Sequence, residues 1–266
     1  VFDANGISVP STWDELNAAA EKLQAAGVIP FAHGGQAWQD ATVFEAVAMG
    51  IGGNNYYKNC YVDLKETCLR SETTVKVFDQ MRKLQGFTDE GSPGRDWNVA
   101  TGMVIEGKAG FQIMGDWAKG EFTAAGKVPG VDYYCAATPS NNGYLYNVDS
   151  FIFYKTSDPD KQEGQKLLAK LMMGKNFQKV FNLYKGSIPA RLDVPMDEFD
   201  KCAKTSNSDI KTAGASGGLV PSFAHGMAQG NTMKAALQDV ITEHFNSDMS
   251  SVDAANALAD SVLDNM

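Results

Sequence analysis

Helical patterns and short apolar runs alternate along most of this chain of 266 residues. The clearest case is Thr12-Trp13-Asp14-Glu15, which has the spacing of a capping box, because the threonine hydroxyl and the glutamate carboxylate can both bond free backbone donors of a first helical turn. An apolar stripe continues to Leu23, Gly27 can end the helix, and residues 29–32 follow as a strand. Helices that alternate with short buried strands predict an α/β layered fold.

The same alternation continues to the end of the chain. We expect further helices over residues 42–49, 73–84, 97–105, 159–173, 176–183, 233–245 and 252–263. Strands are expected at residues 109–114 and 151–154, and residues 217–225 are expected to be irregular. The chain is longer than one hydrophobic core usually fills, so two domains or lobes are expected.

Net charge limits the classes of partner. The formal charge is −9, and no local cluster of Lys and Arg offsets it, so the chain would repel a phosphate backbone. Nucleic acid is therefore not an expected partner. A membrane-spanning helix needs about 20 consecutive apolar residues, and the run from Val99 to Met114 is interrupted by Glu106 and Lys108. We expect no insertion into a membrane.

The four cysteines, Cys60, Cys68, Cys135 and Cys202, contain no C-x-x-C pair and have no histidine at zinc-finger spacing. We therefore predict neither a metal site nor a cofactor. Cys60 and Cys68 bracket a short loop and can close on each other as a disulfide. A bond between Cys135 and Cys202 needs a tertiary contact that the sequence does not specify.

Four residues with complementary chemistry lie in turn-rich breaks between apolar runs: Trp117, Asp149, Lys185 and His225. An indole offers a flat apolar face to the C–H side of a pyranose. A carboxylate, an ammonium group and an imidazole can each hydrogen-bond to ring hydroxyls. The set predicts a site that binds a sugar without a nucleophile or a metal.

Trp38 and Asp116 are further candidates at predicted strand ends, where open α/β sheets place ligands. Trp38 lies in the loop of residues 33–39, and it forms a wall of the pocket or caps the helix that follows. Asp116 and Trp117 come directly after Gly115, which lets backbone approach a ligand closely. The structural alternative places Asp116 as a helix cap and Trp117 in the core.

Other interpretations of these residues also stand. Lys185 can serve as a cation at a helix C-terminus, and a lone histidine such as His225 is more often structural than functional. Asp116 and Asp149 together make a carboxylate pair of the kind that a glycoside hydrolase needs, with acids about 5 to 10 Å apart. An enzyme is therefore the alternative to a binding protein.

The order of motifs resembles the extracellular solute-binding proteins of bacterial carbohydrate ABC importers, in the branch that binds glucose and related monosaccharides. The resemblance rests on 10–15 (PSTWDE), 34–38 (GGQAW), 52–53 (GG), 107–109 (GKA), 115–117 (GDW), 149–150 (DS) and 185–189 (KGSIP). Each motif is weak by itself, but their order and spacing over the chain are specific.

The resemblance implies a periplasmic-binding-protein-like α/β fold of two hinged lobes that close over a sugar. Residues 1–148 and 208–266 would form the second lobe, and residues 152–200 would be helices of the first lobe, most of which is absent from this chain. The chain begins with Val1 and no signal region precedes it, so we expect upstream processing of an exported, periplasmic protein.

The resemblance also implies roles for individual residues. Trp117 looks like the sugar-stacking tryptophan of the family, and Asp149, Lys185 and His225 look like its hydroxyl-binding residues; Trp38 and Asp116 join them as candidates. The implied activity is reversible capture of a sugar, most simply glucose, and delivery to the permease subunits of an ABC importer, without catalysis. Docking to a chemoreceptor as a sugar-sensing module is compatible with this activity.

Overall fold

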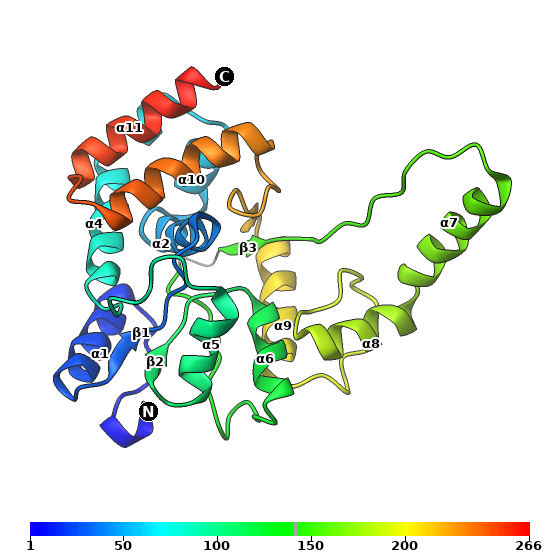
Figure 1. Ribbon diagram of the computed structural model, residues 1–266, viewed down its shortest axis with the longest axis horizontal. Helices are drawn as coiled ribbons and strands as arrows, with labels where there is room; N and C mark the ends of the chain where they lie inside the picture. The colour runs from blue at the N-terminus through cyan, green and yellow to red at the C-terminus, as the bar shows by residue number, and fades with distance from the viewer. Residues whose placement is uncertain (141–142) are drawn as a thin grey trace.

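The computed structural model describes residues 1–140 and 143–266. Figure 1 shows a helix-rich body from which one segment projects far to the side. The elements, in chain order, are η1 (Asp3–Asn5), α1 (Trp13–Ala25), β1 (Ile29–Phe31), α2 (Ala37–Tyr57), η2 (Lys58–Val62), α3 (Glu66–Leu69), α4 (Glu72–Gln85), α5 (Trp97–Ile105), β2 (Ala109–Phe111), η3 (Asp116–Ala118), α6 (Lys119–Ala124), β3 (Tyr144–Tyr146), α7 (Pro159–Met172), α8 (Lys175–Lys185), α9 (Lys201–Ala215), β4 (Leu219–Pro221), α10 (Asn231–Asn246) and α11 (Ser251–Asp264).

The described strands form two small parallel sheets. β1 pairs with β2, so that Ile29 lies opposite Ala109, and β3 pairs with β4, so that Tyr144 lies opposite Leu219. The strand predicted at 29–32 is confirmed as β1, while the one predicted at 109–114 ends at residue 111. The segment 217–225, predicted to be irregular, contains β4, which is held by pairing with a strand distant in sequence.

α1 begins as its sequence predicts. The backbone N–H of Glu15 donates to the Thr12 hydroxyl at 3.1 Å, and the Glu15 carboxylate accepts from the backbone N–H of Thr12 at 3.3 Å. This confirms the capping box. The apolar face of the helix, which includes the fully buried Leu23, packs against β1 and carries the chain into the first sheet.

Four helices form the upper part of the body. α10 and α11 lie across α2 and α4 (Figure 1), and the core that they share contains Phe44, Phe78, Leu237 and Leu258. α2 extends well beyond the predicted 42–49. Its course is broken at Gly53, where φ is 74°, a left-handed conformation that glycine adopts readily.

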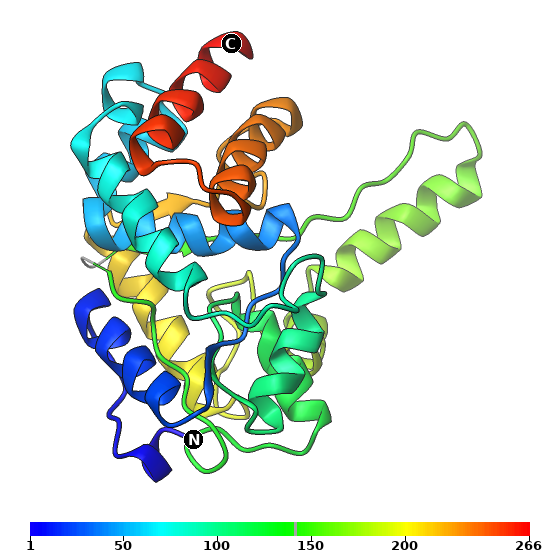
Figure 2. The ribbon, with the colours of Figure 1, turned by 60° about the vertical axis from the view of Figure 1, so that its left-hand side comes forward.

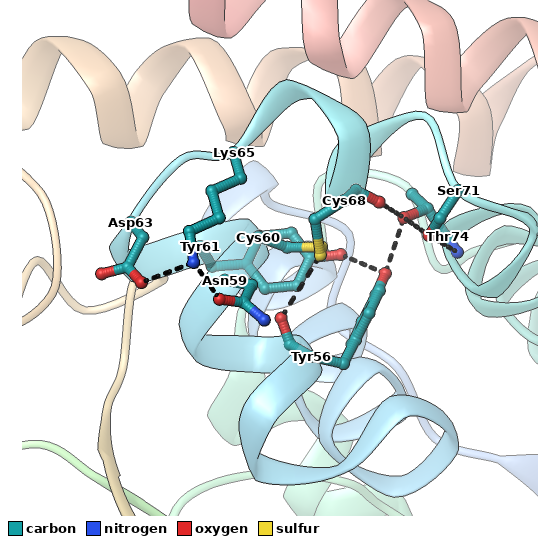
Figure 3. Close-up of a disulfide and its surroundings, with 9 residues drawn as sticks. All are labelled: Tyr56, Asn59, Cys60, Tyr61, Asp63, Lys65, Cys68, Ser71 and Thr74. Carbon is teal, nitrogen blue, oxygen red and sulfur yellow. Dashed lines mark hydrogen bonds and ion pairs between the residues drawn. A yellow bond between two sulfur atoms is a disulfide. The ribbon is translucent and has the colours of Figure 1, made fainter.

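A disulfide between Cys60 and Cys68 closes the loop after α2, as predicted, with 5.2 Å between the Cα atoms. Figure 3 shows that Tyr56 lies beside it, where its hydroxyl contacts the hydroxyl of Tyr61 at 3.0 Å and that of Thr74 at 2.8 Å. These bonds attach the π-helical turn η2 to the first turn of α4. The disulfide and the hydroxyl network therefore hold α2 against α4.

The sequence patterns did not indicate α9, because Ser, Thr, Asn and Gly dilute its apolar stripe. A local cap and distant contacts together fix its start. The Asp200 carboxylate caps the helix by accepting from the backbone N–H of Ala203 at 2.8 Å, and it also accepts from the Lys119 ammonium at 2.7 Å. A second disulfide, between Cys135 and Cys202, resolves the pairing that the sequence left open.

Residues 150–173, which we call the arm, leave the body after β3 and return through α8 (Figure 1). Figure 2, turned by 60°, shows the arm standing away from the body in that view as well. The strand predicted at 151–154 is wrong, because no described strand lies beside this segment to pair with it. The helices predicted at 159–173 and 176–183 are confirmed as α7 and α8.

Within residues 1–140 and 143–266, no helix combines the length and the apolar character that crossing a bilayer requires.

Candidate functional site

His225 lies at the centre of the candidate residues. Its ring meets the indole of Trp117 edge to face, with 5.0 Å between the ring centroids, and lies 6.0 Å from the ring of Trp38. All three side chains are half-buried. The structure therefore brings together residues from the start of α2, from η3 and from the turn after β4, and the first and the last of these are more than 180 positions apart in the chain.

The turn that carries His225 is fixed from beneath by Glu45 of α2. This carboxylate is buried and accepts hydrogen bonds from the Ser222 hydroxyl at 2.6 Å, the backbone N–H of Ala224 at 3.2 Å and the Tyr57 hydroxyl at 3.0 Å. Burial raises the pKa of Glu45 to about 7, although the three hydrogen bonds act to lower it. Sequence reasoning missed Glu45, although a single carboxylate inside the apolar run 41–49 is a signal that it has a buried partner.

Lys185 and Asp149 form an ion pair at the edge of this cluster. Lys185 is the last residue of α8, so it also fulfils the structural role of a cation at a helix C-terminus. Its ammonium lies 5.9 Å from the centre of the Phe181 ring. Asp149 is 60% exposed, and its charge acts on the His225 ring, which links the ion pair to the aromatic cluster.

Two glycines allow the backbone around Lys185 to approach α6. Gly186 follows the helix with φ of 91°, and a Cβ on Gly120 would lie 2.8 Å from the carbonyl oxygen of Lys185. A side chain at position 120 would therefore push the end of α8 away. The position of the Lys185 backbone depends on this close contact between α6 and α8.

Asp116 does not cap the helix that follows it, because no side-chain cap is found at the start of η3 or of α6. Its carboxylate instead accepts from the backbone N–H of Ile188 at 3.0 Å, beside Ser187. Burial raises the pKa of Asp116, whereas the hydrogen bonds from Ser187 and Ile188 lower it. Asp116 thus connects η3, which carries Trp117, to the turn after Lys185.

Trp38 is held by Gln36 rather than serving as a cap of α2. The indole N–H of Trp38 donates to the Gln36 side-chain oxygen at 2.8 Å, and the Gln36 amide nitrogen donates to Asp96 at 2.6 Å. No side-chain cap bonds the first turn of α2. The ring is therefore oriented by a polar network while one part of it stays accessible.

Neither member of the hydrolase alternative is free for catalysis. A raised pKa suits a general acid, but the Asp116 carboxylate is committed to the turn at residues 187–188. Asp149 is paired with Lys185. The arrangement presents aromatic faces and paired polar groups, which suits reversible binding of a hydroxylated ligand better than bond cleavage.

A cavity of about 900 Å³ lies beside the cluster, between β2, the segment 131–140 and α9. Asp116 lines it, whereas Trp117, Asp149, Lys185, His225 and Trp38 do not. The other five candidate side chains therefore lie outside this cavity.

Comparison with known proteins gives the class. Residues 1–172 match the family described as "Bacterial extracellular solute-binding protein", and the chain belongs to this family. Membership makes it part of a binding protein rather than of an enzyme.

Named relatives agree with this class. A "Probable sugar-binding periplasmic protein" of Brucella suis biovar 1 (strain 1330) is 46% identical over 98% of this chain and 62% of its own length. A protein of the same name from Rhizobium meliloti (strain 1021) is 44% identical over 98% of this chain and 63% of its own. The chain thus spans about three fifths of the length of these relatives.

The fold also matches solved structures. A "Chitin oligosaccharide binding protein" superposes with a TM-score of 0.74 over 99% of this chain and 67% of its own, at 18% identity. At that identity the likeness establishes the fold alone, which is the predicted α/β solute-binding-protein fold.

Proposed function

We propose that this chain is part of a periplasmic protein that binds a sugar, glucose or a related monosaccharide, and delivers it to the permease of an ABC importer. The observation that carries the proposal is the gathering of Trp117, Trp38 and His225 next to the Lys185–Asp149 pair. Flat aromatic faces suit the C–H side of a pyranose, and the paired polar groups suit its hydroxyls. The names of the relatives support the same ligand class.

The charges of the cluster favour a neutral sugar over a sugar acid. The positive charge of Lys185 is balanced by Asp149, and burial lowers the pKa of His225 to about 4, so its ring is neutral at pH 7. No unpaired cation therefore remains among the six candidate side chains to neutralise a ligand carboxylate. Glucose should bind more tightly than gluconate.

We further propose that residues 1–148 and 208–266 build the second lobe and residues 152–200 belong to the first. The exposed apolar side chains of the arm support this division, because Ile152, Tyr154 and Leu171 are 74%, 79% and 61% exposed. The rest of the first lobe would cover these side chains and complete the sugar site between the two lobes. The 266-residue chain alone should then bind sugar more weakly than a protein of the relatives' length.

Calorimetric titration with glucose, on a protein of the relatives' length, tests the proposed function. Trp117→Ala should lose about 1 to 3 kcal/mol of binding free energy, because the stacking face is removed. Tyr134→Ala is the matched control, since Tyr134 is an exposed aromatic outside the cluster. Equal affinity for glucose in the wild type and Trp117→Ala would refute the role of Trp117.

A second measurement separates binding from catalysis. Incubation with aryl glycosides should release no aglycone, since neither carboxylate is placed as a free acid or nucleophile. Turnover that disappears in Asp149→Asn would contradict the proposed function directly.

A further inference from the structure

Thr42 contacts the ring of His225 and is not among the residues that the sequence suggested. Its hydroxyl oxygen lies 3.1 Å from Nε2 of His225 and 2.8 Å from the backbone carbonyl oxygen of Trp38. A carbonyl oxygen can only accept a hydrogen bond, and a threonine hydroxyl has one proton to donate. When that proton goes to Trp38, the Thr42 oxygen is left as an acceptor toward His225.

The state of the ring follows from this geometry. A neutral imidazole has one N–H and one lone-pair nitrogen, and its neighbours decide which nitrogen carries the proton. Burial lowers the pKa of His225 to about 4, with Asp149 raising it and Lys234 lowering it, so the ring is neutral at pH 7. Because the Thr42 oxygen accepts a hydrogen bond from the ring, Nε2 must carry the proton.

The ring is also held in place. The backbone N–H of His225 donates to the Ser222 hydroxyl oxygen at 3.1 Å, and Ser222 in turn donates to the buried Glu45. The rings of Trp117 and Trp38 lie 5.0 and 6.0 Å away. The turn and the two indoles together limit rotation of the ring away from Thr42.

We infer that Thr42 is a positioning residue that sets the tautomer of His225, with the proton on Nε2 and the lone pair on Nδ1. The inference rests on the proposed function in one respect, namely that a sugar is the ligand. The histidine then acts toward that ligand as a hydrogen-bond acceptor, so it selects a ligand that offers a hydroxyl donor. Thr42, His225 and Trp38 form one unit, since the same hydroxyl bonds both the helix that carries Trp38 and the imidazole.

Nitrogen-15 NMR of the ligand-free protein at pH 7 tests the tautomer, because the chain has only three histidines and the ring shifts show which nitrogen is protonated. The spectrum of His225→Gln assigns the His225 signals. We expect protonated Nε2 in the wild type and in Thr42→Ser, and a measurable population of protonated Nδ1 in Thr42→Val. A wild-type ring protonated on Nδ1, or ring shifts in Thr42→Val equal to those of the wild type, would overturn the inference.

Thr212→Val is the matched control, because Thr212 makes the same bond to the carbonyl four residues earlier, to Ser208 at 3.0 Å, in α9. It should leave the His225 shifts unchanged. In glucose titrations Thr42→Val should weaken binding roughly threefold to tenfold with an unchanged melting temperature, and Thr42→Ser should restore it. If glucose and related sugars fail to bind even the wild type, the proposed function fails while the NMR result still decides the tautomer.

Discussion

The body and the arm contain similar apolar residues but use them differently. In the body, Leu237 and Leu258 are fully buried in a core built from α2, α4, α10 and α11. In the arm, Leu167 and Leu171 of α7 are 59% and 61% exposed, although they are spaced like a buried helix face. An apolar stripe thus predicts that a helix will be covered, but it does not say by which part of a molecule.

The largest expected effect contrasts a leucine from each region. Leu237→Ala should lower the free energy of unfolding by about 2 to 5 kcal/mol, because it leaves a cavity in the core. Leu167→Ala, the matched change in the arm, should change it by less than about 0.5 kcal/mol. Chemical denaturation of the 266-residue chain measures both, and similar losses for the two variants would show that the arm is packed.

The next effect concerns a buried carboxylate of the body. Because the pKa of Glu45 is raised to about 7 in the folded state, from 4.5, the folded protein binds more protons than the unfolded one between these values. Glu45 therefore favours folding below pH 4.5, and this contribution, on the order of 3 kcal/mol, is lost as the pH rises through 7.

Glu45→Gln should remove that dependence, so the difference in unfolding free energy between variant and wild type should change from pH 4.5 to 7.5. Glu163→Gln is the same substitution on an exposed carboxylate of the arm and should leave the profile unchanged. Parallel profiles for Glu45→Gln and the wild type, measured by urea denaturation across this range, would contradict the burial of a titrating carboxylate in the body.

A smaller effect is expected at His244, which is buried in α10 against Phe78, with 4.7 Å between the ring centroids. Neither ring nitrogen has a hydrogen-bond partner within residues 1–140 and 143–266. His244→Leu should raise the free energy of unfolding by about 1 kcal/mol at pH 7, since an unsatisfied buried polar group is removed.

The stabilisation that His244→Leu provides should grow as the pH falls. Burial lowers the pKa of His244 to about 4, so the unfolded chain takes up a proton that the folded one does not between about pH 6.5 and 4. The wild type therefore loses stability over this range, and His244→Leu should lose less. If His244→Leu is instead less stable than the wild type at both pH 7 and pH 4, the imidazole has hydrogen-bond partners in solution.

The smallest free energies are expected for the local opening of single backbone amides. Hydrogen exchange measures them and compares the body with the arm directly. Amides of α2 and α10 should open with a free energy close to that of global unfolding, whereas those of residues 150–158, which lie in irregular exposed backbone, should open at near zero cost. Protection of the arm equal to that of α10 in the 266-residue chain would remove the distinction between the regions.

Much of the body could be predicted from the sequence, because its signals are local. The capping box at Thr12 and Glu15 specifies where α1 begins, and the spacing of Cys60 and Cys68 allows their disulfide. The predicted strand at 151–154 failed because strand propensity does not supply a neighbouring strand. α9 was missed because distant contacts, at Cys135 and Lys119, secure a locally weak helix.

In the candidate site, too, local signals could be predicted from the sequence and distant contacts could not. The sequence indicated Trp117, Asp149, Lys185 and His225 by residue type and by their place in turns, and the structure brings them into one neighbourhood. The sequence could not indicate that Asp116 accepts a hydrogen bond from the turn at Ile188, since this contact joins residues 72 positions apart. Thr42 and Glu45 act through His225 and its turn, which lie about 180 positions further along the chain.

A crystal structure of the protein with glucose, at the length of its relatives, tests the central claim most directly. We expect the pyranose to lie flat against the Trp117 indole, with its hydroxyls within hydrogen-bond distance of the Lys185–Asp149 pair and of His225 Nδ1. A sugar bound elsewhere, with Trp117 and Lys185 not in contact with it, would contradict the account.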